Sequence, residues 1–230
     1  MALRPESGGA EREGVIKFRL EHEHQQLIEL IGRAELEALA RPLMSWRARL
    51  YELGMIGGDD PTRYDGAGFG NLSARLPNSE SFIITGTQTG HLKELSLCDF
   101  ALVQHVALRE HRLVSRGETL PSSEALTHAA IYLLSPELRW VFHVHAPQLW
   151  QARESLELIE SPAHVAYGTQ EMAEEVERLA RDEGLMEAGV FAMGGHEDGL
   201  IAFGRDPNEI GAGLLALERR SRERLRALDA

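Results

Sequence analysis

Two histidines separated by one residue, His143 and His145, end a run of alternating large residues that starts at Arg139. Residues two apart in a strand project from the same face of a sheet, so both imidazoles could bind one metal ion. The same spacing is common in proteins without a metal, because two histidines with satisfied hydrogen bonds at a sheet edge need none. The pair alone leaves both interpretations open.

A third imidazole, His196, lies in the glycine-rich segment 194–199, where the backbone can approach other groups closely. Three imidazoles would hold Zn²⁺ and leave a coordination position open, as in catalytic zinc sites. Mn²⁺ or Co²⁺ would suit the same ligands. The pair His22 and His24 has the same spacing but lies among glutamates and glutamines. We interpret that pair as a solvated polar face and exclude it.

The segment 121–124, Pro-Ser-Ser-Glu, predicts the start of a helix over 122–134. Helix N-termini favour anions and serine hydroxyls add donors, although an ordinary N-cap is the alternative interpretation. The spacing differs from a capping box, which leaves the Glu124 side chain available for another task. Glu124, His128 and Tyr132 would then share one helical stripe, either a solvated face or a pocket wall.

Two further loops are rich in glycine and hydroxyl groups: 70–73, Gly-Asn-Leu-Ser, and 85–90, Thr-Gly-Thr-Gln-Thr-Gly. Such loops can present amides and hydroxyls to phosphate oxygens, although a simple turn explains each of them equally well. Neither matches the phosphate-binding loop of nucleoside triphosphatases or the dinucleotide fingerprint.

The elements that must position these residues follow from hydrophobic periodicity and from glycine and proline breaks. We expect helices over 34–53, 122–134, 171–180 and 207 to about 228, and strands over 66–76, 81–85, 100–108, 139–145, 189–193 and 199–203. Residues 15–20 alternate as in a half-exposed strand or an arm on another surface. Because there is no repeat or linker, we expect one α/β domain over 15–230, preceded by a mobile tail over 1–14.

The composition of the 230 residues excludes several classes of partner and site. Lys and Arg number 24 against 36 Asp and Glu, a net charge of −12 without a basic patch, which argues against nucleic acid. Local arginines, hydroxyls or amides must therefore hold any anionic ligand. The single cysteine, Cys98, rules out an internal disulfide and multi-cysteine metal sites. Without an apolar stretch of about 18–20 residues, we expect a cytoplasmic protein with no membrane partner.

Taken together and in order, these motifs resemble the class II aldolase/adducin family, which includes L-fuculose-phosphate aldolase and L-ribulose-phosphate 4-epimerase. The resemblance runs from about Ala34 to Phe203 and rests on Gly70-Asn71-x-Ser73, Thr85-Gly86, Ser122-Ser123-Glu124, His143-x-His145 and His196. It implies a three-layer α/β/α fold with a mostly antiparallel central sheet. It also implies a homotetramer with active sites at subunit boundaries.

The resemblance assigns roles to individual residues. It makes His143, His145 and His196 the zinc ligands and Glu124 the acid/base. It implies a phosphate pocket lined by Gly70, Asn71, Thr85, Gly86, Ser122 and Ser123. The implied activity is a zinc-dependent, aldolase-like lyase that acts on a small phosphorylated hydroxy-carbonyl compound through a metal-stabilised enediolate.

One departure from the family pattern keeps alternative reactions open. Family aldolases protonate the departing aldehyde with a tyrosine near the carboxyl end, whereas the last tyrosine here is Tyr167. A dehydratase or decarboxylase of a sugar or sugar-acid phosphate is therefore an alternative, and so is a non-catalytic, adducin-like assembly module. Retention of the three histidines favours an enzyme. The missing acid could come from a neighbouring subunit, for instance Tyr51, Tyr64 or Tyr167.

Assembly is also expected from exposed apolar surface. The arm over 15–20 and the leucines of the terminal helix, Leu214, Leu215, Leu217 and Leu225, offer more of it than a compact monomer readily hides. Closed symmetry is the usual way in which identical chains bury such surface.

Overall fold

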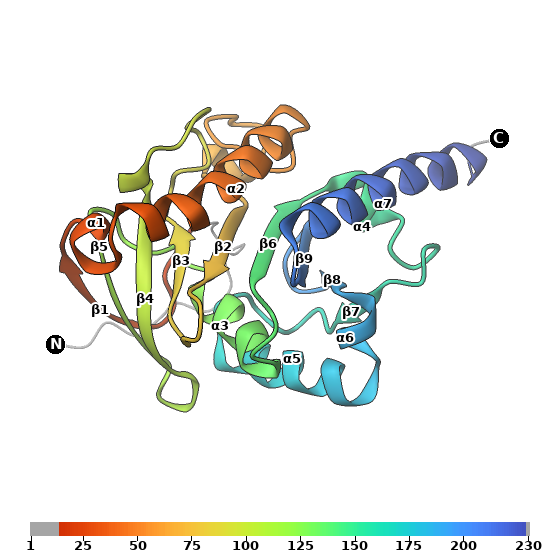
Figure 1. The fold of residues 1–230 in the computed structure, drawn as a ribbon. Coiled ribbons are helices and arrows are strands. Elements are labelled where there is room, and N and C mark those ends of the chain that lie inside the picture. The colour runs from red at the N-terminus through yellow and green to blue at the C-terminus, as the bar shows by residue number, and fades with distance from the viewer. Residues whose placement is uncertain (1–13, 229–230) are drawn as a thin grey trace, which may run out of the picture.

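The computed structural model describes residues 14–228 (Figure 1). The expected mobile tail over 1–14 thus lies outside the described residues, apart from Gly14. The strands are β1 (Arg19–His24), β2 (Asn71–Arg75), β3 (Phe82–Thr85), β4 (Phe100–Ala107), β5 (Arg112–Gly117), β6 (Trp140–His145), β7 (Ile159–Ser161), β8 (Val190–Met193) and β9 (Gly199–Gly204). They form one sheet in the order β1-β5-β4-β3-β2-β6-β9-β8-β7.

Seven α-helices surround this sheet in the described part of the chain. They are α1 (Leu27–Ile31), α2 (Arg33–Glu52), α3 (Ala125–Leu134), α4 (Pro147–Gln151), α5 (Gln170–Asp182), α6 (Leu185–Ala188) and α7 (Pro207–Leu228). Short 3₁₀ turns cover Tyr64–Gly66, Leu97–Asp99 and Leu108–Glu110. None of the described helices is both long and apolar enough to cross a membrane.

The predicted sheet is confirmed as mostly antiparallel, with parallel pairs only at its edges. Strand β1 runs parallel to β5 at one edge of the sheet, and β7 runs parallel to β8 at the other. All the other strand pairs of the sheet are antiparallel. The sheet is therefore mixed. Sequence-distant segments meet at its centre, where β6 pairs with both β2 and β9.

Helices cover both faces of the sheet and give the three predicted layers (Figure 1). One core contains leucines of α1, α2, α4 and α7, and the other contains apolar residues of α3, α5 and α6. Along β6, Phe142 and Val144 belong to the first core, whereas Val141 belongs to the second. Because side chains alternate along a strand, His143 and His145 share the face of Val141, toward α3.

Local sequence explains where the two long helices lie. Helix α2 buries Leu36, Leu39 and Leu43 along one stripe, as its period of three and four predicts. Helix α7 begins after Asp206, whose Oδ1 accepts hydrogen bonds from the amides of Asn208 at 2.7 Å and Glu209 at 3.3 Å. Asp206 is thus the N-cap of α7, and the expected helix from 207 to about 228 is confirmed.

The amino-terminal arm differs from the expectation. The strand covers Arg19–His24 rather than 15–20, and Phe18 is buried in the core of its own chain. The structure also buries Leu214. Part of the apolar surface that suggested assembly is therefore covered within the monomer, because β1 adds to the sheet edge beside β5 and Leu214 of α7 packs in the first core. Strands β5 and β7 were not predicted, since β5 is only half apolar and β7 has three residues.

Candidate active site

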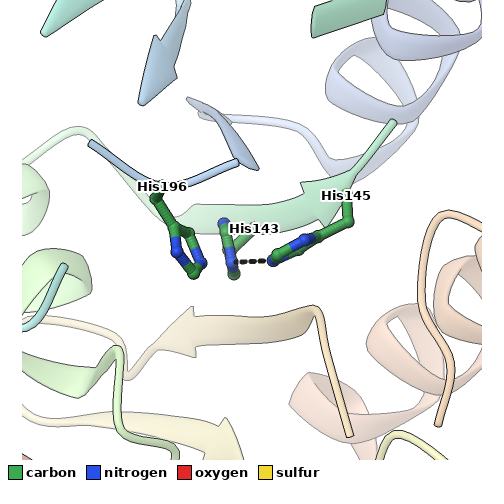
Figure 2. Close-up of side chains that lie close together, drawn as sticks. All are labelled: His143, His145 and His196. Carbon is green, nitrogen blue, oxygen red and sulfur yellow. Dashed lines mark hydrogen bonds between the residues drawn. The ribbon is translucent and has the colours of Figure 1, made fainter. Parts of the chain in front are cut away.

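Three imidazoles converge at the centre of the sheet (Figure 2). The nitrogen atoms of His143, His145 and His196 that could bind a metal all lie within 4.8 Å of one another, and all three residues are buried. The Nε2 atoms of His143 and His145 are 3.1 Å apart. Among the described residues, these three histidines form the group of potential metal ligands that the fold brings together.

Strand β6 fixes the first two histidines because it is held by strands on both sides. The Nδ1 atom of His143 lies 3.2 Å from the carbonyl oxygen of Leu200 on β9. A carbonyl only accepts, so Nδ1 carries the proton and the lone pair of Nε2 faces the other imidazoles. Such a backbone partner typically orients a metal-binding histidine.

The turn between β8 and β9 presents the third imidazole. The amide of His196 donates to the carbonyl of Met193, and the carbonyl of His196 accepts from the amide of Gly199. A Cβ atom at position 199 would lie 2.7 Å from Cδ2 of His196, so a side chain there would displace the ring. Glycine at 199 therefore allows His196 to fold back over β6.

The donor set fits a divalent metal ion. Imidazole nitrogens about 2.0–2.1 Å from a tetrahedral Zn²⁺ lie about 3.3 Å from one another, close to the 3.1 Å between His143 and His145. The Oε1 atom of Glu124 lies 3.6 Å from Nε2 of His196 and 3.8 Å from Nε2 of His143. A buried carboxylate thus adjoins two of the three buried imidazoles.

Glu124 is positioned as the residue before α3, so the helix begins at Ala125 and not at residue 122 as expected. Residues 120–122 are instead tied to the loop that follows β3. The amide of Ser122 donates to the carbonyl of Thr85, the amide of Thr87 donates to that of Leu120, and Gly86 bridges Pro121. These main-chain bonds bring the two hydroxyl-rich segments together.

A small concave surface, here called the hydroxyl cavity, lies beside Glu124. It is lined by Gly14, residues 68–71, residues 86–90 and residues 122–124. Gly70, Asn71, Gly86, Ser122 and Ser123 of the predicted pocket therefore lie together. Thr85 does not line the hydroxyl cavity. Its hydroxyl instead accepts a hydrogen bond from the amide of Leu72 at 3.2 Å. No lysine or arginine is among its lining residues.

Asn71 links the hydroxyl cavity to the imidazoles. It is the register partner of His143 across β2 and β6, so the two side chains share one face of the sheet. Asn71 is 7% exposed, and its Oδ1 accepts no hydrogen bond from the described residues. A buried amide oxygen of this kind favours a ligand that donates a hydrogen bond.

Arg47, which the sequence analysis did not single out, holds one wall of this cavity. It is 2% exposed and lies in the middle of α2. Its guanidinium donates to the carbonyls of Lys93, Thr89 and Gly90 at 2.8–3.0 Å. Burial lowers the pKa of Arg47 from its ordinary value. An arginine on the apolar stripe of a predicted helix was the available signal.

The stripe of Glu124, His128 and Tyr132 is neither a solvated face nor one pocket wall. His128 and Tyr132 are buried, and the Oγ atom of Ser73 lies 2.7 Å from both Nδ1 of His128 and the hydroxyl of Tyr132. Burial lowers the pKa of His128 to about 3, so this imidazole is neutral. Of the three residues, only Glu124 borders the hydroxyl cavity.

Two tyrosines considered as acids from a neighbouring subunit lie beside the imidazoles of their own chain. The ring of Tyr64 lies 4.7 Å from that of His145, and its hydroxyl donates to Asp198 at 2.6 Å. The ring of Tyr167 lies 4.6 Å from that of His196. Burial is the larger cause that raises the pKa of Tyr64, and the hydrogen bond to Asp198 is the second.

Other features of the sequence lie away from this centre. Tyr51 packs against the guanidinium of Arg47 on α2. His22 is half-buried and lies within hydrogen-bond distance of Ser115 and Gly117, which agrees with its exclusion as a ligand. A cavity of about 530 Å³ lies between α7 and strands β8 and β9, and its lining is mostly apolar and contains none of the three imidazoles.

Comparison with known proteins identifies the fold. The chain is similar in structure to YgbL from Klebsiella pneumoniae, described as a putative aldolase/epimerase/decarboxylase, with 21% identity, 81% of this chain and 88% of that chain covered, and a TM-score of 0.60. It is also similar to L-fuculose-1-phosphate aldolase from Thermus thermophilus, with 19% identity, 85% and 95% covered, and a TM-score of 0.58.

A third similar structure is a sugar-phosphate aldolase from Thermotoga maritima, with 17% identity, 82% of this chain and 94% of that chain covered, and a TM-score of 0.60. At such identities these likenesses establish the fold alone. The sequence itself matches the class II aldolase and adducin N-terminal domain over residues 61–225, most of its length. The chain therefore belongs to the class II aldolase and adducin family.

Proposed function

We propose that the chain is a divalent-metal-dependent lyase that acts on a small phosphorylated hydroxy-carbonyl compound, with aldol cleavage as the reaction. The observation that carries this proposal is the cluster of three imidazoles beside Glu124, at the edge of the hydroxyl cavity. Catalytic zinc sites combine three protein ligands with an open position, and this donor set provides three ligands.

His143, His145 and His196 would hold the ion, with Zn²⁺ as the first choice and Mn²⁺ or Co²⁺ as alternatives. When bound, the ion supplies a Lewis acid that polarises the substrate carbonyl and stabilises the negative charge that its oxygen gains as the carbon–carbon bond breaks. The carbonyl of Leu200 keeps the His143 ring in the orientation that this role needs.

Glu124 would move the proton. Its Oε1 atom lies beside two of the imidazoles, so it can hold a proton or return it at the substrate carbon that carries negative charge after cleavage. Burial between the imidazoles and the hydroxyl cavity excludes bulk water from this transfer.

The hydroxyl cavity would hold the phosphate group. Its main-chain amides and the hydroxyls of Ser122 and Ser123 can donate to phosphate oxygens without a cationic side chain. Gly70, Asn71 and Gly86 let the backbone and an amide group approach the ligand. Thr85 would act indirectly, because its hydroxyl fixes the amide of Leu72 at the start of β2.

Dehydration or decarboxylation of a phosphorylated sugar or sugar acid is the second candidate reaction. The same residues would stabilise the same negative charge, and the tyrosines beside the metal-binding imidazoles differ in position from the carboxyl-terminal acid that family aldolases use. A purely structural, adducin-like role is less consistent with three converging imidazoles and a buried carboxylate.

We also propose that the protein is a cytoplasmic homotetramer whose active sites lie at subunit boundaries. The family relation supports this assembly, and so does the exposed apolar cavity of about 530 Å³ beside α7. Sedimentation would test it: a monomer at micromolar concentration that is fully active and metal-loaded would contradict both the assembly and the shared sites.

Metal analysis tests the proposed centre directly. We expect His145→Ala to lose the divalent metal that the wild type retains after dialysis, because two imidazoles bind much more weakly than three. His22→Ala is the matched control, since His22 has the same sequence spacing and should leave the metal content unchanged. Equal metal content in His145→Ala and wild type would contradict the site.

Turnover is tested separately on the metal-replete protein with a panel of phosphorylated ketoses and sugar acids. Cleavage of a ketose phosphate would support the aldolase, and carbon dioxide or water release from a sugar-acid phosphate would support the second candidate. Absence of turnover with every compound of the panel would contradict the proposed enzyme class.

A further inference from the structure

A second cavity, here called the arginine cavity, borders the metal-binding cluster at His145. It has a volume of about 280 Å³ and lies between the end of α2, the start of α4 and the middle of α7. The polar side chains that line it are those of Arg63, His145, Gln148, Glu218 and Arg222. The hydroxyl cavity shares none of these residues.

Arg63 forms one wall and is held in place by the main chain. Its Nη1 donates to the carbonyl of Gly54 at 2.7 Å, and its guanidinium carbon lies 4.3 Å from the ring centre of Phe69. Nη2 lies 3.4 Å from the hydroxyl of Tyr64, the tyrosine that packs on His145. The cation is therefore fixed beside a metal-binding imidazole.

Arg222 forms the opposite wall from the surface of α7. Its Nε donates to Gln148 of α4 at 3.1 Å, and its Nη2 donates to Glu218 at 2.9 Å. The Glu218 side chain is 12% exposed, whereas the Arg222 side chain is 50% exposed. Glu218 thus orients a guanidinium that keeps further donors for a ligand in the cavity.

The charges of the lining select an anion. Two guanidinium groups face one carboxylate, so the arginine cavity carries a net positive charge in a chain whose net charge is −12. Guanidinium groups offer paired N–H donors whose spacing matches the two oxygens of a carboxylate. A neutral aldehyde end of a sugar would use neither arginine.

We propose that the arginine cavity binds a carboxylate at the end of the substrate opposite its phosphate, so that the substrate is a phosphorylated sugar acid. This inference rests on the proposed function, because the phosphate must occupy the hydroxyl cavity for the carbon chain to cross the imidazole cluster. The inference then specifies the second charged group and its two partners, Arg63 and Arg222.

A pair of ligands that differ in one group tests the inference. Binding of erythronate 4-phosphate and erythritol 4-phosphate to the zinc-loaded protein is measured by calorimetry, since only the first has a carboxylate. We expect wild type to bind the acid at least about 10-fold more tightly than the alcohol, as charge-assisted hydrogen bonds require. Arg222→Met should remove most of this preference without changing the affinity for the alcohol.

Arg219→Met is the matched control, because Arg219 is exposed on α7 and lines none of the cavities described above. It should keep the full preference for the acid. Arg63→Lys, which retains the charge but loses the paired donors, should reduce the preference without the folding risk of removing a half-buried cation. Equal affinity of wild type for the two ligands, or an unchanged preference in Arg222→Met, would overturn the inference.

A different measurement tests the proposed function. Inorganic phosphate binding to the zinc-loaded protein should weaken in Ser123→Ala and stay unchanged in Arg222→Met if the hydroxyl cavity holds the phosphate. Loss of preference for the acid with intact phosphate binding would overturn only the role of the arginine cavity. Failure of wild type to bind phosphate and both ligands would overturn both proposals.

Discussion

The two cavities beside the imidazole cluster are built from different chemistry. The hydroxyl cavity uses main-chain groups of loops that β-bridge bonds and the buried Arg47 hold in place. The arginine cavity uses long side chains that reach in from the loop after α2 and from the surface of α7. The hydroxyl cavity is suited to an anion through main-chain dipoles, and the arginine cavity is suited to one through charged side chains.

This difference has consequences for affinity and selectivity. Donors on a fixed backbone lose little conformational entropy when they bind a ligand, and salt affects them little. Arg222 is half-exposed, so salt screens its attraction for an anion, and ordering its side chain costs entropy. The hydroxyl cavity should therefore supply affinity common to many phosphorylated compounds, while the arginine cavity should select among them.

The largest expected effect comes from Glu124, which borders the hydroxyl cavity beside the imidazoles. Glu124→Gln keeps the size of the side chain and removes proton transfer, so we expect turnover to fall by about 10²–10⁴ while affinity in both cavities is retained. Turnover and zinc content are measured on the same preparation. A Glu124→Gln protein with wild-type turnover would remove this carboxylate from the mechanism.

Acid should destabilise the fold through the buried imidazole of His128. His128 is a buried residue of α3, and burial lowers its pKa to about 3, whereas the unfolded chain has the ordinary value near 6.5. The unfolded state thus binds the extra proton between these values. We expect the free energy of unfolding to fall by up to about 1.4 kcal/mol per pH unit as the pH drops below 6.5, with no contribution above it.

Urea unfolding at several pH values measures this slope. His128→Gln should flatten it relative to wild type, while His24→Gln, at an exposed position of β1, should leave it unchanged. A slope equal in His128→Gln and wild type would show that another group governs acid stability.

The backbone of the hydroxyl cavity should be sensitive to a single methyl group. Gly70 has a φ of +76°, and a Cβ there would lie 2.7 Å from Cγ1 of Ile56. We expect Gly70→Ala to destabilise the fold by about 1–3 kcal/mol and to weaken phosphate binding without affecting the preference for a carboxylate.

Gly213→Ala provides the control on α7. A Cβ at position 213 meets no atom within 4 Å, so alanine should stabilise the helix by about 0.5–1 kcal/mol. Thermal unfolding compares the two variants. A Gly70→Ala protein as stable as wild type would mean that the loop before β2 tolerates a different path.

The smallest effect should come from one hydroxyl group of the hydroxyl cavity. Ser123→Ala removes a single neutral donor, which corresponds to about 0.5–1.5 kcal/mol, or roughly a 2- to 12-fold weaker affinity for phosphate. The affinity should depend little on salt in both proteins. A steep salt dependence in wild type would place the phosphate near the arginines instead.

The residues that could be recognised in the sequence are those with a local signal. His143 and His145 lie two apart in an apolar strand, and the repeat of leucines in α2 gave that helix almost to its ends. The segment 121–124 marked a helix start, but the helix begins later because the amide of Ser122 donates to the carbonyl of Thr85 at the end of β3. That bond joins segments distant in sequence, and no local pattern encodes it.

The arginine cavity had no sequence signal at all. Arg63 follows a proline-containing loop and Arg222 lies among several charged residues of α7, so neither is distinctive by type or spacing. Their proximity depends on the packing of α7 against α4 and β9, which is a tertiary property. Arg47 differs from these two, because its place on the apolar stripe of α2 was a signal, although an arginine within a helix is normally exposed.

The position of the three imidazoles in the sheet sets the route by which a bound ion could leave. Two lie on β6, which has hydrogen-bonded neighbours on both sides, whereas His196 lies in the turn of a hairpin near one edge. Hairpins near an edge open far more often than central strands. Hydrogen exchange of amides in residues 193–199 should therefore slow on metal loading, and the dissociation rate of the ion should follow that local opening rather than global unfolding.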